Sequence, residues 1–166
     1  MCLKKIIIGL VLVCILIMSA ACSDTGSEDT LPTVTSIGEI NESMLQIEFV
    51  ADGWISHTQS PGETWRKKTG DCEDYAWLAL ELLNQIGVEG YVLEVYCKPK
   101  YPMPNHAVCI FKDDELTDGK YWFYSNSILR KTDCDKLEEA VYRVRIKSWV
   151  IGWKLINSDG KVVQRG

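Results

Sequence analysis

The stretch Gly70-Asp71-Cys72-Glu73-Asp74-Tyr75-Ala76 begins the clearest helix signal in this sequence, which predicts a helix from about Cys72 to Ile86. Apolar residues recur there at intervals of three and four, as on the buried side of an amphipathic helix. Asp71 is a good N-cap, and Gly87 suits the position just after the helix. The pattern therefore places a thiol at the first position of a capped helix.

The position of Cys72 indicates a reactive thiol. A helix N-terminus stabilises negative charge, because its first backbone N–H groups are unpaired and the helix dipole is positive there. We therefore expect the pKa of the Cys72 thiol to be lowered from its usual value of about 8.5 toward about 4–7. The alternative is a small buried hydrophobe, but Asp71, Glu73 and Asp74 make the position polar.

The order of elements around this helix predicts the fold class. Helix-like spacing covers 40–52 and one helical turn is expected at 63–68, whereas after the helix the hydrophobic period changes to two. We expect strands at 90–97, 106–111, 121–124, 143–150, 153–156 and 161–163, and a short helix within 134–142. Helices followed by antiparallel strands indicate an α+β domain with a helix packed on one face of the sheet.

Two polar residues are expected to meet beside the strand that follows the loop at 98–105. His106 begins that strand, and Asn126 follows the next one. Asp118-Gly119 predicts a hairpin between them, which returns the end of the later strand beside His106. A histidine beside a cysteine can act as base and then as acid, and a third polar group orients its ring. His57 is interpreted as an exposed loop residue.

The segments 70–76, 78–87 and His106-Ala107-Val108 together resemble the core of the transglutaminase-like superfamily, and most closely its bacterial cysteine peptidases. The resemblance covers roughly 54–129. It implies a papain-like or transglutaminase-like core, in which the central helix carries the cysteine and packs on an antiparallel sheet. It also implies a Cys-His-Asp arrangement, with Cys72 as the nucleophile and His106 as the base.

The third member of this arrangement departs from the family pattern. The strand after the histidine usually ends in Asp, where this chain has Tyr124-Ser125-Asn126. We expect Asn126 to orient His106, because an amide oxygen can accept a hydrogen bond from an imidazole. Ser125 is the alternative, and strand alternation lets only one of the two face the ring. Loss of the carboxylate would reduce the stabilisation of the imidazolium ion.

The resemblance implies a thiol hydrolase that acts on amide bonds of a peptide, protein or cell-wall substrate through a thioester. Hydrolysis is expected rather than cross-linking, because water outcompetes an amine unless the site excludes it. No metal and no organic cofactor are implied, and we expect a monomer. The alternative is a binding module that keeps the fold but has lost the chemistry.

The N-terminal residues predict a lipoprotein leader. A positive start at 1–5 and an apolar run at 6–18 precede Ser19-Ala20-Ala21-Cys22, which resembles a bacterial lipobox apart from Ser19. We therefore expect a signal peptide at 1–21, lipid on Cys22, a flexible tether at 22–38 and a transglutaminase-like domain at 39–166. The mature protein would be anchored to the membrane on its extracytoplasmic face. An ordinary secretory signal is the alternative.

Composition excludes several classes of function. The net charge is −5, and a chain this acidic is a poor nucleic-acid binder because phosphate contacts need clustered Lys and Arg. The cysteines lack the spacing of a zinc finger. Once the leader, the lipidated Cys22 and Cys72 are set aside, three cysteines remain for at most one disulfide: Cys97, Cys109 and Cys134.

Overall fold

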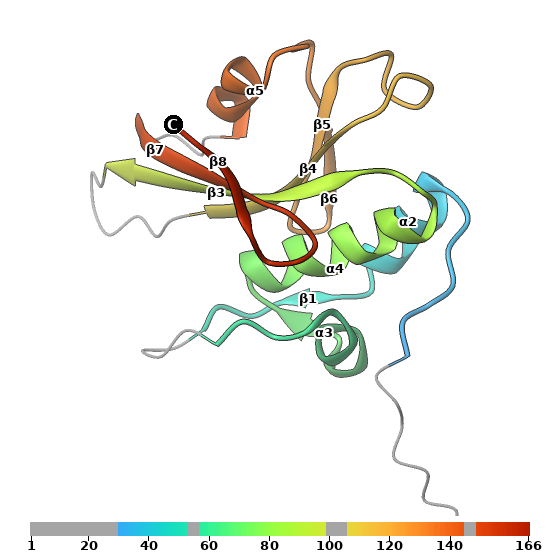
Figure 1. Ribbon diagram of the computed structural model, residues 1–166. Coiled ribbons are helices and arrows are strands. Elements are labelled where there is room, and N and C mark those ends of the chain that lie inside the picture. Colours follow the sequence, from blue (N-terminus) through green and yellow to red (C-terminus); the bar gives the residue numbers. More distant parts are fainter. Residues whose placement is uncertain (1–29, 53–56, 99–105, 145–148) are drawn as a thin grey trace, which may run out of the picture.

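A computed structural model describes residues 30–52, 57–98, 106–144 and 149–166. The expected signal peptide, the lipidated Cys22 and the first part of the tether lie outside the described residues. The small elements come first in the chain, and the main sheet follows (Figure 1).

The described residues form four helices, labelled α2 to α5, and eight strands, labelled β1 to β8. The bounds are α2 (Ile37–Met44), β1 (Glu48–Phe49), α3 (Pro61–Lys67), β2 (Thr69–Gly70), α4 (Cys72–Gln85), β3 (Gly90–Lys98), β4 (His106–Lys112), β5 (Tyr121–Ser125), β6 (Ile128–Lys131), α5 (Leu137–Val144), β7 (Trp149–Ile156) and β8 (Val162–Arg165).

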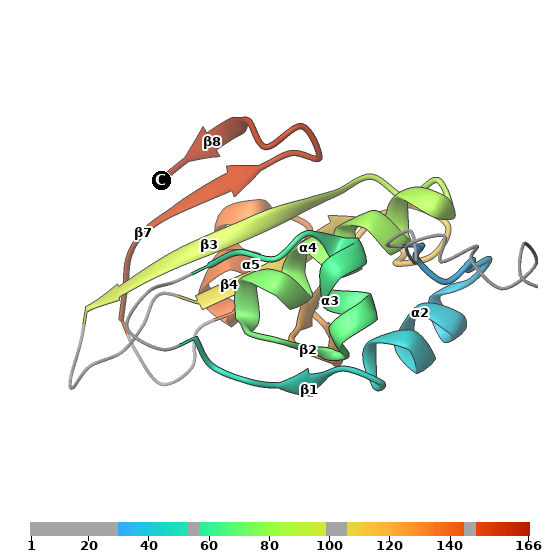
Figure 2. The same cartoon turned by 90° about the horizontal axis from the view of Figure 1, so that it is seen from below.

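The main sheet has six strands in the order β6-β5-β4-β3-β7-β8, and every neighbouring pair is antiparallel. Helix α4 packs on one face of this sheet and α5 covers the other (Figures 1 and 2). Strands β1 and β2 form a separate parallel pair. This arrangement confirms the predicted α+β class, with the cysteine-bearing helix packed on an antiparallel sheet.

Alternation along β4 divides the core into two layers. Ala107, Cys109 and Phe111 pack on the α4 side, whereas Val108 and Ile110 pack on the α5 side. Since successive side chains of a strand point to opposite faces, a strand buried on both sides reads as a continuous apolar run. The run from 107 to 111 is therefore explained by helices on both faces of the sheet.

Helix α4 begins with a capping box. The Asp71 side chain accepts from the backbone N–H groups of Glu73 and Asp74, and the Asp74 side chain accepts from the backbone N–H of Asp71. This exchange satisfies donors that a helix N-terminus otherwise leaves unpaired. At the other end, Gly87 adopts a φ of 75°, a conformation that costs glycine little.

Some expected elements are wrong in extent. The helix expected over 40–52 ends at Met44, and the chain then forms β1, because residues 48–49 pair with β2. Arg143 and Val144 end α5 instead of beginning a strand, since the apolar positions of α5 pack under the sheet. Strand β6 was not expected, and its exposed residues carry little hydrophobic alternation.

Gly70 is required where β2 meets α4. A Cβ built on Gly70 would lie 2.7 Å from the Asp74 Cβ, closer than real Cβ atoms come, and 3.2 Å from the Thr64 Cγ2, a tight contact. We expect Gly70→Ala to lower the free energy of unfolding by about 1–3 kcal/mol, the usual cost of overpacking. Urea unfolding followed by circular dichroism measures this change.

Gly38→Ala is the matched control, because its added Cβ would meet only the Ser36 Oγ, at 3.7 Å. Gly38 lies within α2, where alanine is favoured over glycine by up to about 1 kcal/mol. Equal stability of the two variants would contradict the close approach described at Gly70.

Candidate functional site

Cys72 is the first residue of α4, and its half-buried side chain packs against the core on that side of the sheet. The backbone N–H of Ala107 lies near the Cys72 thiol and favours its thiolate, which lowers the pKa of Cys72. Ala107 is the second residue of β4 and directly follows His106. The start of the helix that carries the thiol thus lies beside the start of the strand that carries the histidine.

His106 is the first residue of β4, and its partner lies on the neighbouring strand. The His106 Nε2 atom is 3.0 Å from the Oγ of Ser125, the last residue of β5. Because this hydrogen bond engages Nε2, the other ring nitrogen of His106, Nδ1, is not bound to Ser125. No hydrogen bond joins the Cys72 thiol to His106 among the described residues, and the Ala107 amide near the thiol directly follows His106.

The expectation that Asn126 rather than Ser125 binds His106 is wrong, because Ser125 makes this hydrogen bond. Asn126 has a φ of 52° in the hairpin turn between β5 and β6, so it has left the strand. Its Oδ1 atom is buried and has no hydrogen-bond partner among the residues that the structure describes. The preceding Tyr124 packs on the α4 side and donates to the Asn41 Oδ1, so β5 stays in register with the core up to the residue before Ser125.

Electrostatics at the thiol also differ from the expectation. Burial raises the pKa of Cys72 above its ordinary value, and the carboxylates of Asp71 and Glu73 add to this rise. The backbone N–H of Ala107 opposes it by favouring the thiolate. The expected lowering of the Cys72 pKa is therefore wrong, because desolvation outweighs the effect of the helix N-terminus.

Burial lowers the pKa of His106 below its ordinary value, because the charged imidazolium is poorly solvated there. The raised pKa of the Cys72 thiol and the lowered pKa of His106 together favour a neutral thiol and a neutral imidazole near pH 7. A neutral imidazole can accept a proton, so the resting site retains a base.

A buried carboxylate holds the N-terminus of α4 against the segment that precedes α3. Asp74 is fully buried and accepts from the Gln59 backbone N–H at 2.7 Å and from its side-chain Nε2 at 2.9 Å. Thr58 Oγ1 donates to Glu73 beside it. In the sequence Asp74 is only one of three acids beside Cys72, and its link to Gln59 spans 15 residues with no local signal.

Further candidate sites are limited in the part of the chain that is described. No group of three or more His, Cys, Asp or Glu side chains there could hold a metal ion, and no helix is long and apolar enough to cross a membrane. The four cysteines within the described ranges are free: Cys72, Cys97, Cys109 and Cys134.

Comparisons with known proteins point to one family. A family model described as a transglutaminase-like domain matches residues 29–124, which include Cys72 and His106. The chain is similar to the calcium-bound structure of LapG from Legionella pneumophila, at 17% identity and a TM-score of 0.47, covering 77% of this chain and 68% of that one. The EGTA-treated LapG structure is similar at 17% identity and a TM-score of 0.45, covering 70% and 62%. No curated protein matches the chain in sequence.

The acidic neighbours of Cys72 add to the effect of burial on the pH at which the thiol reacts. We expect Glu73→Gln to lower the pKa of the Cys72 thiol, because one of the carboxylates that raise it is removed. Alkylation of Cys72 by iodoacetamide at pH 8 should therefore be faster in this variant than in the unmodified protein. Mass spectrometry of the Cys72 peptide over a pH series measures the rate.

Glu81→Gln is the control, since Glu81 is an exposed residue further along the same helix and its substitution makes the same change in charge. Both profiles should rise toward alkaline pH. A Glu73→Gln profile that coincides with that of Glu81→Gln would contradict the electrostatic account.

Proposed function

The chain belongs to the transglutaminase-like domain family, and on this premise we propose that it is a cysteine hydrolase that cleaves amide bonds in peptides, proteins or cell-wall peptides. One observation carries this proposal: the Cys72 thiol at the start of α4 packs against the core beside the amide of Ala107, which directly follows His106. A nucleophile and a base therefore come from two elements that pack against one another.

The reaction begins with a neutral Cys72 thiol and a neutral His106 imidazole. His106 takes the proton from the Cys72 thiol as the sulfur attacks the substrate carbonyl carbon. The Ala107 N–H stabilises the developing thiolate until the bond forms. Because contacts in a resting site are often long and tighten when substrate binds, the missing direct Cys72–His106 hydrogen bond is compatible with this step.

Collapse of the tetrahedral intermediate gives a thioester. The backbone N–H of Cys72 stabilises the oxyanion of that intermediate. The protonated His106 then gives its proton to the leaving amine as the C–N bond breaks. A water molecule, deprotonated by His106, attacks the thioester carbonyl, which releases the carboxylic acid product and restores the thiol.

Ser125 takes the orienting role in this proposal. Its Oγ lies at hydrogen-bond distance from His106 Nε2, where the family pattern has a carboxylate. A hydroxyl can fix the orientation and tautomer of the ring, but it carries no charge to stabilise the imidazolium ion. The site is therefore proposed to be slower than one that retains the carboxylate.

A binding module without turnover is the second candidate. Two observations favour it: a hydroxyl stands at the position of the family's carboxylate, and burial raises the pKa of Cys72. Activity profiling against peptide and cell-wall peptide libraries, with Cys72→Ala as the control, separates the two candidates. Turnover that depends on Cys72 supports the hydrolase, and its absence across the libraries supports the binding module.

The roles of the site residues predict graded kinetics. Cys72→Ala and His106→Ala should each abolish turnover, because nucleophile and base act as a unit. Ser125→Ala should lower kcat/KM by about tenfold, the worth of one hydrogen bond, and Ser125→Asp should raise it. Steady-state kinetics on the best library substrate measures each change.

Asn126→Ala is compared with Ser125→Ala, because Asn126 lies next in the chain and its Oδ1 has no hydrogen-bond partner within the described ranges. We expect the smaller loss in Asn126→Ala. If Asn126→Ala loses more kcat/KM than Ser125→Ala, the assignment of Ser125 as the orienting residue is wrong.

We also propose that the protein is a lipoprotein anchored at Cys22 on the extracytoplasmic face of a membrane, with a soluble catalytic domain. The support is the short apolar run that ends in Ala20-Ala21-Cys22 and the polar segment that follows it. Metabolic labelling with a palmitate analogue should mark the protein, and Cys22→Ala should abolish the mark. Cys14→Ala is the control, and equal labelling of the Cys22→Ala variant would refute the anchor.

A further inference from the structure

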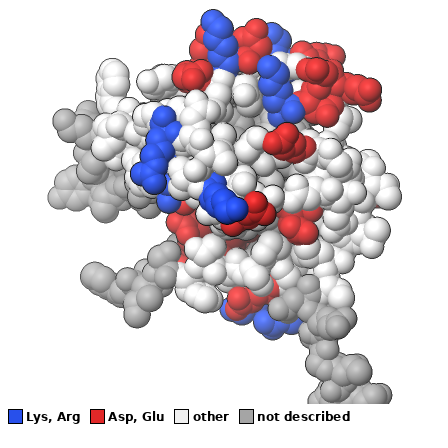
Figure 3. Space-filling model, viewed as in Figure 1, with Lys and Arg blue, Asp and Glu red and all other residues white. Residues whose placement is uncertain are grey.

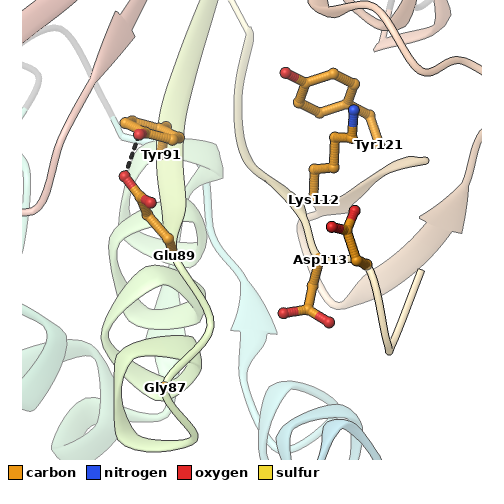
Figure 4. Close-up of a pocket in the computed structure, with 7 residues that line it drawn as sticks. Gly87, Glu89, Tyr91, Lys112, Asp113 and Tyr121 are labelled. Atoms are coloured by element: carbon orange, nitrogen blue, oxygen red, sulfur yellow. Dashed lines mark hydrogen bonds between the residues drawn. The ribbon is translucent and has the colours of Figure 1, made fainter. Parts of the chain in front are cut away.

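Two hollows on the α5 side of the sheet share the same tyrosine walls. One has a volume of about 430 Å³ and the other about 290 Å³, and Tyr91 and Tyr121 line both. Tyr91 comes from β3 and Tyr121 from β5, so the two rings flank the intervening strand β4 (Figure 4). The two hollows adjoin at these tyrosines on either side of β4, and together we call them the tyrosine groove.

One end of the tyrosine groove is acidic. Glu89, Asp113 and Asp114 line it, and no ion pair neutralises any of these three carboxylates among the described residues. Asp113 accepts from the backbone N–H groups of Glu115 and Leu116. These donors are neutral, so they do not cancel the negative charge of Asp113. Figure 3 shows acidic side chains gathered at the upper right, over the turn between β4 and β5.

Lys112 is the cation that lines this end, and it is already engaged. Its Nζ donates to the backbone oxygen of Asp135 at 3.1 Å and lies 5.5 Å from the centre of the Tyr121 ring. The position over the ring shows that a tyrosine wall accommodates an ammonium group. One positive charge against three carboxylates leaves a net negative charge at this end of the groove.

The tyrosine walls suit a cation as well. The Tyr91 hydroxyl donates to Glu89, and this bond raises the pKa of Tyr91 to about 12. Both walls therefore stay neutral at physiological pH and present aromatic faces, which attract ammonium and guanidinium groups. An entering cation would meet carboxylates at one end and ring faces at the sides.

The other end of the groove is apolar. Its lining includes Ile110 from β4, Leu137 from α5, Leu155 from β7 and Val163 from β8. An occupant that fills the whole groove must therefore carry a positive charge at one end and an apolar group at the other. Together the two hollows fall in the usual range of ligand-site volumes.

We propose that the tyrosine groove binds a peptide segment in which a lysine or arginine lies beside an apolar residue. Charge complementarity favours this occupant over a neutral glycan, which would leave the carboxylates of Glu89 and Asp114 uncompensated. The groove lies on the sheet face opposite α4, so it is separate from the Cys72 site. The proposal does not rest on the hydrolase function.

Binding of a defined peptide tests this proposal. Fluorescein-labelled Leu-Lys-Leu-Lys amide should bind to the whole protein in a fluorescence anisotropy titration, with affinity that falls as NaCl is raised. The same affinity is expected for the unmodified protein and for Cys72→Ala, which cannot turn the probe over. Failure of the hydrolase proposal would leave this readout unchanged.

The decisive variant combines Glu89→Gln and Asp114→Asn, two exposed residues whose substitution should not disturb folding. We expect it to weaken binding of the basic peptide at least fivefold. The control combines Glu42→Gln and Glu81→Gln, which removes two exposed carboxylates outside the groove and should leave binding unchanged. Thermal unfolding of both double variants confirms that they are folded.

Three outcomes would overturn the proposal. They are equal affinity in the two double variants, equal binding of the acidic peptide Leu-Glu-Leu-Glu amide, and displacement of the basic peptide by a tetramer of N-acetylglucosamine. The last outcome would assign the groove to a glycan instead.

Discussion

The site depends on one buried carboxylate. Asp74 lies within α4, fully buried, and accepts hydrogen bonds from Asp71 on its own helix and from Gln59 before α3. A buried carboxylate is tolerated only when hydrogen bonds replace its lost hydration, so these donors must stay in place. The same contacts hold the backbone on which Cys72 stands. The same hydrogen bonds therefore cap α4 and fix the position of the nucleophile.

The sequence predicted those parts of the fold that rest on local patterns. The bounds of α4 follow from its cap, its apolar spacing and Gly87, and the core of β3, β4 and β5 follows from short runs of apolar residues between loops and turns. The error over 45–52 has a physical cause: β1 consists of two exposed residues that are held by pairing with a distant partner. A strand this short and exposed leaves no hydrophobic periodicity in the sequence from which it could be predicted.

The sequence predicted the residues of the candidate site better than it predicted the contacts between them. Cys72 and His106 were identified from a helix N-terminus and a strand start, and both do lie at those positions. The choice between Ser125 and Asn126 depended on where β5 ends, and the positive φ of Asn126 takes its side chain out of the alternation. The pKa of Cys72 depended on burial, which the sequence of one helix turn does not reveal.

Strand β3 pairs with β4 on one edge and with β7 on the other, and its Val92 meets Ile156, 64 positions later in the chain. The residues of the candidate site lie between 72 and 125, so all of them precede β7 in the chain. Helix α4 can therefore join β3, β4 and β5 while one edge of β3 still lacks its partner. An unpaired edge in the middle of a sheet invites wrong pairing, so the C-terminal strands protect a site to which they contribute no residue.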